Sequence, residues 1–329
     1  MSKVLVIGSN SFSGASFCGW LLDQGIDVIG VSRSAQPADV MLPYRWGKKT
    51  ARFEFKTIDI NHDIETLDAL IKKEHVGVIV NFAAQSMVGE SWDKPDDWMH
   101  TNVVSAARLA ERLRHIDFLD RYVHVTTPEV YGSTDGWITE ETPFNPSTPY
   151  AVSRAAGDML FKIYRETYQL PVVATRAANV YGPGQQLFRI IPRTIFFLLK
   201  GKPLQLHGGG SSTRSFINMD DVSSATWLIA HKAPVGETYH ISTDRIVSIR
   251  ELVEILCARI GRDFNQCVEV VGERLGKDSA YWLNSKKLRS TLGWKDSISL
   301  EQGLEQTIAW VENNLAELQK QPANYIHKP

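Results

Sequence analysis

The feature that most constrains the fold is a regular alternation of short apolar segments and helical segments in the first half of the chain. Predicted strands cover residues 4–7, 27–32, 53–58, 76–82, 122–126 and 172–176. Predicted helices lie between them, at 13–24, 63–74, 96–114 and 149–168. Because the strands are almost continuously apolar, they are typical of parallel strands covered by helices on both faces. The sequence therefore predicts an α/β fold with a Rossmann-type, doubly wound parallel sheet.

A different pattern begins after Arg176. Turn-rich segments lie among one predicted strand, at 237–241, and several predicted helices. These helices are at 190–200, 219–231, 248–260, 285–291 and 300–319. This mixture indicates a smaller α+β lobe, from which part of the chain returns to the main sheet. We therefore expect two domains, 1–175 and 176–329. Residues 321–329 carry no helix or strand pattern.

Composition argues against several classes of protein. The chain has 329 residues, 43% hydrophobic and 22% charged, with a formal net charge of −1. No broad basic field is present to recruit nucleic acid or an anionic membrane, and no segment reaches transmembrane length. A strand begins at Lys3, which leaves no room for a signal peptide, and the three cysteines lack metal-binding spacing. We expect a cytoplasmic protein with reduced thiols and no metal.

A glycine-containing loop follows the first predicted strand directly. It reads Gly8-Ser9-Asn10-Ser11-Phe12-Ser13-Gly14 and opens the first predicted helix. Glycine at such a turn lets the backbone approach a pyrophosphate, which the helix N-terminus stabilises. We therefore expect a nicotinamide dinucleotide at Gly8, Ser11, Phe12 and Gly14. Ser11 stands where the fingerprint has its middle glycine, so the motif is incomplete.

The residues after the second predicted strand favour NADP. Sites for NAD usually carry Asp or Glu here, to bind the ribose 2′-hydroxyl, whereas this chain has Ser32-Arg33-Ser34. Hydroxyls and a guanidinium suit a 2′-phosphate, although Arg33 can also be a solvated loop cation and NAD stays open. Asp59 and Ile60, after the third predicted strand, are candidates to bind the adenine amino group, and Asp59 can equally be a turn residue.

Two further segments carry candidate chemistry. Residues 126–132, TTPEVYG, follow a predicted strand, and ligands bind beyond the carboxyl ends of parallel strands. In residues 147–154, STPYAVSR, Thr148 predicts a helix start. Tyr150 and Arg154 then share one helical face. Because a guanidinium beside a phenol favours the phenolate, Tyr150 is a candidate base near neutral pH; the alternative is a surface tyrosine beside an arginine.

Together these segments resemble the extended short-chain dehydrogenase/reductase superfamily, and within it the nucleotide-sugar 4,6-dehydratases. The resemblance covers nearly the whole chain. Further segments that carry it are 81–86, 101–102, 179–183, 214–221 and 274–281. The middle and C-terminal segments resemble dTDP-glucose 4,6-dehydratases, whereas the region of Arg33 and the segment Ala83-Ala84-Gln85-Ser86 resemble GDP-mannose 4,6-dehydratases.

The resemblance implies a lyase reaction with no net redox change. Tyr150 would take the proton of the hexose O4 while hydride leaves C4 for the nicotinamide, and Thr127 would orient O4. Glu129 would remove the C5 proton, water would leave C6, and hydride would return to C6. The product would be an NDP-4-keto-6-deoxyhexose. Ala83, Tyr150 and Arg154 would also contact the cofactor.

The resemblance also implies a nucleotide-diphosphate sugar as substrate. The residues at the family positions that bind it are Ser86, Asn179, Arg189, Arg214 and Arg274. Arginine forks suit phosphate oxygens, and a nearly neutral protein must place such cations locally. Without the family pattern, each arginine reads as a surface ion pair. Relatives commonly pair through helices that correspond to 96–114 and 149–168, which implies a homodimer.

Three substitutions depart from the family pattern. Arg154 replaces a lysine, so the charge stays but the cationic group is planar and bulkier. Pro128 replaces the aspartate that protonates the departing C6 hydroxyl in dTDP-glucose dehydratases, which leaves both proton transfers to Glu129. Ser11 adds a side chain close to the pyrophosphate. Three functions stay open: the dehydratase, a sibling 4-epimerase or C6 decarboxylase, and a cofactor-binding protein without turnover.

Overall fold

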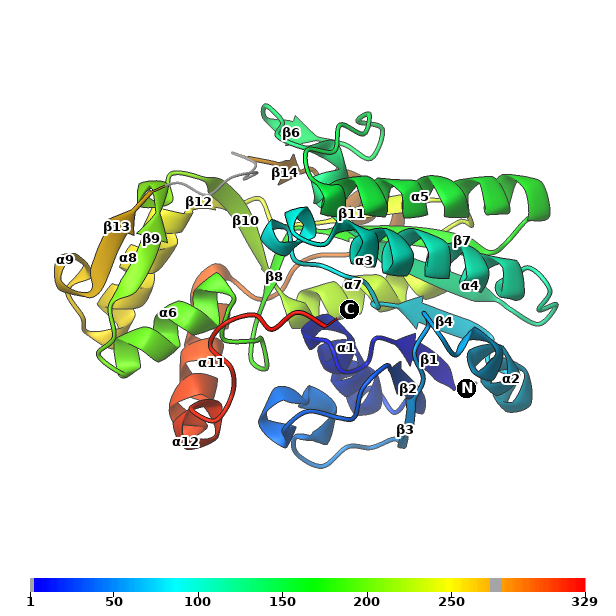
Figure 1. Ribbon diagram of the computed structural model, residues 1–329, viewed down its shortest axis with the longest axis horizontal. Coiled ribbons are helices and arrows are strands. Elements are labelled where there is room, and N and C mark those ends of the chain that lie inside the picture. The colour runs from blue at the N-terminus through cyan, green and yellow to red at the C-terminus, as the bar shows by residue number, and fades with distance from the viewer. Residues whose placement is uncertain (1–2, 273–279, 329) are drawn as a thin grey trace.

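A seven-stranded sheet forms the centre of the computed structural model, which describes residues 3–272 and 280–328 (Figure 1). The strand order is β11-β7-β5-β4-β1-β2-β3, and every neighbouring pair is parallel. The strands are β1 Val4–Ile7, β2 Val28–Ser32, β3 Phe53–Thr57, β4 Val78–Asn81, β5 Arg121–Thr126, β7 Val172–Ala177 and β11 Thr238–Ile241. The chain winds outward from β1 in both directions, which confirms the predicted doubly wound sheet.

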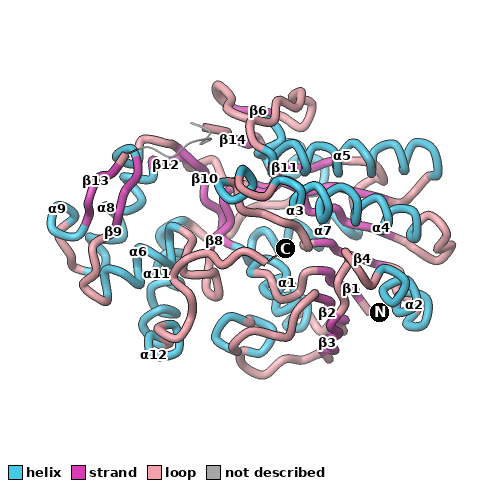
Figure 2. The backbone as a smooth tube through the Cα atoms, viewed as in Figure 1, coloured by secondary structure: helices cyan, strands magenta, loops and turns pink. Residues whose placement is uncertain are grey.

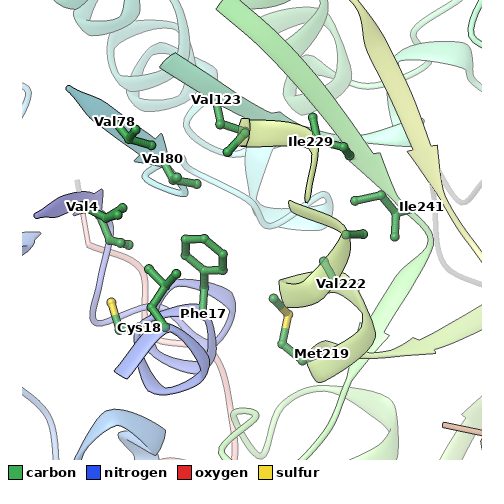
Figure 3. Packing of buried hydrophobic residues seen from close by; sticks show 14 of the residues in the cluster. Val4, Phe17, Cys18, Val78, Val80, Val123, Met219, Val222, Ile229 and Ile241 are labelled. Carbon is green, nitrogen blue, oxygen red and sulfur yellow. The ribbon is translucent and has the colours of Figure 1, made fainter. Parts of the chain in front are cut away.

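Each face of the sheet has its own hydrophobic core, because successive side chains of a strand point to opposite faces. Val4 and Val6 of β1 enter one core, part of which Figure 3 shows, and Leu5 and Ile7 enter the other. The covering helices are α1 Phe12–Asp23 and α7 Met219–Lys232 on the first face, and α2 Ile64–Glu74, α4 Ser105–Leu113 and α5 Pro149–Tyr168 on the second. Both faces of the sheet are therefore buried, as its apolar strands require.

The segment predicted as one helix at 96–114 contains an irregular turn. Helix α3, Pro95–Met99, joins α4 through a π-helical turn, His100–Val104. Asn102 of this turn accepts a hydrogen bond from the backbone N–H of Gln85 (3.0 Å) and donates to the carbonyl of Gln85 (3.0 Å) and the hydroxyl of Ser153 (2.9 Å). The turn therefore ties the loop after β4 to helix α5, both of which line the candidate site.

A second lobe is built from the C-terminal half. Its strands are β8 Asn179–Tyr181, β10 Thr213–Asn218 and β12 Ile246–Ser248 in one sheet, and β9 Leu204–His207 and β13 Val268–Val271 in another. Helices α6 Ile190–Leu199, α8 Ile249–Ile260 and α11 Leu300–Asn313 enclose a separate core with them. Strand β11 and helix α7 come from the same half but pack on the main sheet. The division at residues 175 and 176 stays our proposal.

Several further short elements complete the fold. They are α9 Phe264–Cys267, α10 Lys286–Leu292, α12 Leu315–Leu318, and the paired strands β6 Trp137–Ile138 and β14 Trp282–Leu283. The helix predicted at 300–319 is thus two helices, since Asn314 leaves the helical conformation (φ −119°, ψ 16°). After α12 the chain has two turn residues, several bends and then no regular structure up to Lys328, and Figure 2 draws this segment as loop.

The described part of the chain has neither a helix that could span a membrane nor a cluster of possible metal ligands. No helix within residues 3–272 and 280–328 is long and apolar enough to cross a membrane. In the same ranges, no group of three or more His, Cys, Asp or Glu side chains is placed to hold a metal ion. Cys18, Cys257 and Cys267 are free thiols.

Candidate active site

The candidate site begins at the carboxyl end of β5, where a short 3-10 helix, Pro128–Tyr131, follows the strand. Thr127 has an extended conformation and caps this helix, since its hydroxyl accepts a hydrogen bond from the N–H of Glu129 at 3.3 Å. Pro128 occupies the first helical position, which needs no N–H and suits the fixed φ of proline. Pro128 therefore has a local structural role, although it supplies no acid.

Helix α5 brings the second group of candidate residues to the same place. Thr148 caps it by accepting from the N–H of Ala151 at 3.1 Å, and Pro149 fills its first turn. The Tyr150 side chain is buried and forms a hydrogen bond with the side chain of Thr127. The structure therefore brings together a phenol and a hydroxyl that lie 23 positions apart in the sequence.

Without a bound cofactor, the pKa of the Tyr150 phenol is raised, whereas the sequence predicted that it is lowered. Burial raises the pKa of the phenol above its ordinary value of 10.0, and the negative charge of Glu129 adds to this effect. The charges of Arg154 and Arg189 and the hydrogen bond from Thr127 lower the pKa, but burial is the larger influence. The neighbouring guanidinium reduces the cost of the phenolate without making Tyr150 a base near neutral pH.

Arg154 is fixed to the central sheet. Its guanidinium is buried and donates a short hydrogen bond from Nη2 to the carbonyl of Val125 in β5. Its Nε is buried without a hydrogen-bond partner among the residues that the structure describes. The planar guanidinium can hold a strand carbonyl and present a second N–H at once, which a single ammonium does not do in this fixed geometry.

Tyr281 completes the group around Glu129; it was part of the family resemblance, but no role was predicted for it. Its phenol lies 3.5 Å from Oε1 of Glu129 and donates to Oδ1 of Asn179 at 3.1 Å. The guanidinium carbon of Arg214 lies 4.6 Å from the centre of the Tyr281 ring. The only sequence signal for Tyr281 was its place in segment 274–281, within the family resemblance.

The predicted substrate residues have different surroundings. Arg214 is buried and donates from Nη1 to the carbonyl of Thr213 at 2.8 Å. Arg189 precedes α6, and its charge acts on Tyr150, so it belongs to the same site. Ser86 is exposed in the loop after β4. Arg274 lies outside the described residues.

A buried polar network supports the 3-10 helix from behind. The phenol of Tyr131 accepts from Nη1 of Arg176 (2.7 Å) and contacts Nε2 of His240 (2.8 Å). Arg176 also pairs with Asp158 at 2.7 Å, and His124 lies 3.2 Å from the same carboxylate. Burial alone would raise the pKa of Asp158, but His124 and Arg176 together lower it to about 2. Burial, assisted by Arg176, lowers the pKa of His240 to about 3.

The glycine loop has the close contacts that the dinucleotide motif predicts. Gly8 has φ +83°, and a Cβ there would lie 2.6 Å from the backbone nitrogen of Ala83. A Cβ on Gly14 would lie 2.2 Å from the Gly8 carbonyl oxygen. The Ser11 hydroxyl donates to that carbonyl (2.7 Å) and accepts from the N–H of Gly14 (3.1 Å), which caps α1. Ser11 is thus turned into the loop, and buried Phe12 begins the helix.

The loops after β2 and β3 lie at the same edge of the sheet, beyond the carboxyl ends of the strands. The Ser32 hydroxyl accepts from the backbone N–H of Asn10 at 2.9 Å. Arg33 donates from Nη2 to the carbonyl of Lys328 at 2.9 Å. The Asp59 carboxylate accepts from the N–H of Asn61 at 2.9 Å, as a turn residue does, and Ile60 is buried. A helix N-terminus, hydroxyls and a guanidinium around one loop fit the phosphates of a dinucleotide.

Comparisons with known proteins agree with this geometry. The family model for GDP-mannose 4,6-dehydratase matches residues 5–307. The dTDP-glucose 4,6-dehydratase of Haemophilus influenzae is 30% identical over 332 residues, which cover 94% of this chain and 98% of the relative. The solved structure of the dTDP-glucose 4,6-dehydratase DesIV of Streptomyces venezuelae, with NAD bound, has a TM-score of 0.88 and 32% identity, and the match covers 96% of this chain and 98% of that one.

Other relatives are longer than this chain. A trifunctional UDP-glucose 4,6-dehydratase, 3,5-epimerase and reductase of Arabidopsis thaliana is 33% identical over 266 residues, which cover 80% of this chain. The match spans only 40% of that relative's length. The family model, in contrast, extends over most of the present chain and includes both the glycine loop and the Tyr150 helix. The chain therefore belongs to the GDP-mannose 4,6-dehydratase family, within the extended short-chain dehydrogenase/reductase superfamily of nucleotide-sugar enzymes.

Proposed function

We propose that the protein is a nucleotide-sugar 4,6-dehydratase, which converts an NDP-hexose to an NDP-4-keto-6-deoxyhexose. The observation that carries the proposal is the gathering of Thr127, Glu129 and Tyr150 at the end of β5, with Tyr281 on the carboxylate. A phenol, a hydroxyl and a carboxylate are the groups needed at O4 and C5 of one hexose ring. When bound, the nicotinamide supplies the hydride acceptor for C4, the hydride donor for C6 and a positive charge beside Tyr150.

In this proposal the residues of the chain move two protons. Tyr150 takes the proton from O4, while Thr127 holds O4 and Tyr150 in line. Glu129 takes the proton from C5 and returns it to the departing C6 hydroxyl, since Pro128 has no acid. Hydride then adds to C6 and one proton returns to C5, which replaces the proton that Tyr150 took from O4. Atoms balance, because one water leaves and the hydride taken from C4 ends on C6. Tyr281 and Asn179 keep the Glu129 carboxylate in place.

For the substrate we propose a nucleotide diphosphate held by Arg189, Arg214 and Asn179. Arg214 is buried and lies against Tyr281, which places a fixed cation beside the proposed hexose position. Arg274 and Ser86 remain candidates for the same ligand. For the cofactor we propose NADP, because Ser32 and Arg33 end β2 where an acidic residue would favour NAD. The bound cofactor in DesIV is NAD, so both dinucleotides should be tested.

We also propose a homodimer through helix α5. Val152, Met159 and Ile163 lie seven and four positions apart, on one helical face, and are 43%, 55% and 53% exposed. Such a row of exposed apolar side chains is typical of a surface that pairs. Sedimentation of the wild type and of Met159→Glu should give a dimer and a monomer, respectively. A monomeric wild type at micromolar concentration would contradict the proposal.

Product mass tests the proposed reaction directly. The purified protein is incubated with NADP or NAD and a panel of GDP-, dTDP- and UDP-hexoses, and the sugar nucleotides are analysed by mass spectrometry. A dehydratase gives a product lighter by one water. Loss of carbon dioxide from a nucleotide uronic acid, or an unchanged mass with inverted C4, would instead support the decarboxylase or the epimerase. Glu129→Gln should abolish water loss, and a wild-type rate in this variant would remove Glu129 from the mechanism.

A further inference from the structure

The residues after α12 form an extended strap, residues 321–328, which returns from the second lobe to the main sheet. In Figure 1 this red segment runs from α12 to the end marked C, beside α1. The burial of its side chains alternates. Ala323, Tyr325 and His327 are partly buried, whereas Asn324, Ile326 and Lys328 are exposed. This two-residue period indicates a segment that lies along a surface with one side facing the protein.

The strap contacts the second lobe at its start. Nη1 of Arg193 donates to the carbonyl of Ala323 at 2.8 Å and to the side chain of Asn324 at 3.2 Å. The ring of Tyr325 packs edge-on against Phe188, with ring centres 5.4 Å apart. Phe188 immediately precedes Arg189, a proposed substrate residue. The strap therefore passes the substrate side of the site before it reaches the cofactor side.

His327 holds the strap against α3. Its ring is nearly parallel to that of buried Trp98, with an interplanar angle of 8° and ring centres 5.1 Å apart. Its Nε2 lies 2.6 Å from Oδ2 of Asp97. A stacked ring with an anchored nitrogen is a directional contact, which fixes the position of the backbone on either side of it.

The backbone carbonyl of the next residue, Lys328, accepts hydrogen bonds from two side chains at the proposed dinucleotide site. The carbonyl oxygen of Lys328 accepts from Nη2 of Arg33 at 2.9 Å and from Nε2 of Gln85 at 2.6 Å. Arg33 follows β2 and Gln85 follows β4, and these strands flank β1. One atom within hydrogen-bond distance of both donors must therefore lie across the carboxyl end of β1, where the glycine loop would hold the dinucleotide phosphates.

We infer that the dinucleotide groove is also the binding site of an internal peptide ligand, the strap, and that the cofactor binds only after the Tyr325–Lys328 end of the strap leaves. The inference rests on the proposed function, since it takes the groove to bind NADP or NAD. A docked strap uses the donors of Arg33 and Gln85, so the two ligands exclude each other. The apparent dissociation constant of the cofactor then equals its intrinsic value divided by the fraction of molecules with a released strap.

Cofactor affinity in strap variants tests this competition. A chain ending at Gln321 should bind NADP about tenfold more tightly than the full chain, as expected if roughly one molecule in ten has a released strap. His327→Ala should give an intermediate gain. Ile326→Ala is the matched control, because this side chain is 64% exposed on the outer side of the strap and should change nothing. Weaker or equal binding by both the truncated chain and His327→Ala would overturn the inference.

Two further measurements, hydrogen exchange and competition by a peptide, do not depend on enzyme activity. Saturating NADP should speed hydrogen exchange at the amides of residues 323–328 in the full chain, and slower exchange would instead make the strap a cover over bound cofactor. A synthetic peptide of residues 321–329, added to the truncated chain, should raise the apparent dissociation constant for NADP. If neither the full nor the truncated chain binds NADP or NAD, the proposed dinucleotide site fails as well; if both bind equally, only the strap inference fails.

Discussion

The two ends of the candidate groove are held in different ways. At the catalytic end, Tyr131 links the Glu129 turn to the buried pair of Arg176 and Asp158. At the other end, where we propose that the adenosine part of the cofactor binds, Arg33 and Gln85 donate to the backbone carbonyl of Lys328. The side chain of Lys328 is exposed. We call this the adenosine end. The first arrangement cannot change without disturbing the core, whereas the second can exchange one acceptor for another. If the proposals above hold, the residues for chemistry are fixed by the interior, whereas the residues that bind the strap or the cofactor lie nearer the surface.

The largest effect should follow a change at the catalytic end itself. Tyr150→Phe removes the proposed base but keeps the ring that is packed at the start of α5. Turnover should fall about a thousandfold, within the range for loss of a general base, while circular dichroism and thermal stability stay close to the wild type. Tyr168→Phe, at the exposed end of the same helix, is the matched control. Turnover within tenfold of the wild type would show that another group deprotonates O4.

The buried ion pair of Arg176 and Asp158 lies behind the catalytic end, and loss of a charge there should lower stability more than at an exposed pair. Asp158→Asn leaves Arg176 buried without its counterion, which should lower the free energy of unfolding by about 3 kcal/mol. Glu254→Gln breaks an exposed pair with Arg250 and should cost less than about 0.5 kcal/mol. Urea denaturation measures both variants. Equal losses would contradict a special contribution of the buried pair to stability.

The same network should make stability depend on pH. His240 has a folded pKa of about 3, so it is neutral in the folded protein at pH values where the unfolded chain binds protons. Burial also lowers the pKa of His124. A folded pKa below the unfolded value means that the contribution is complete above about pH 6.5 and is lost as the pH falls. The slope should approach about 1.4 kcal/mol per pH unit for His240.

Urea denaturation between about pH 7.5 and 5.5 measures this slope. His240→Asn removes this titrating group, so the variant should lose less stability than the wild type over the same interval. A wild-type unfolding free energy that stays flat below pH 6.5 would contradict the assignment of a neutral, buried His240.

The sequence predicts the regular parts of the site because local rules set them. Helix α5 spans 149–168 as predicted, since Thr148 and Pro149 define its start. Gly8 and Gly14 were likewise recognisable, because a turn next to a strand admits no side chain there. The seven main strands follow from their apolar composition. These features depend on neighbours within a few positions of the chain.

Features that depend on distant residues could not be predicted. Burial of Tyr150 reversed the expected direction of its pKa, and burial is a property of the folded molecule. Tyr281 reaches Glu129 from 152 positions away, and Lys328 reaches Gln85 from 243. Short strands such as β8 have too few residues for an alternating pattern, so no strand was predicted there.

The smallest effect expected here is a change in cofactor affinity, and it separates the two proposed roles of Arg33. Arg33→Ala removes the proposed partner of the 2′-phosphate, so NADP should bind about tenfold more weakly. The same change removes a donor from the Lys328 carbonyl, so NAD, which has no 2′-phosphate, should bind equally well or slightly more tightly. Arg52→Ala, at a 92% exposed side chain, is the control. Equal weakening of both cofactors would mean that Arg33 neither selects the phosphate nor holds the strap, and the two ends of the groove would then differ less than their contacts suggest.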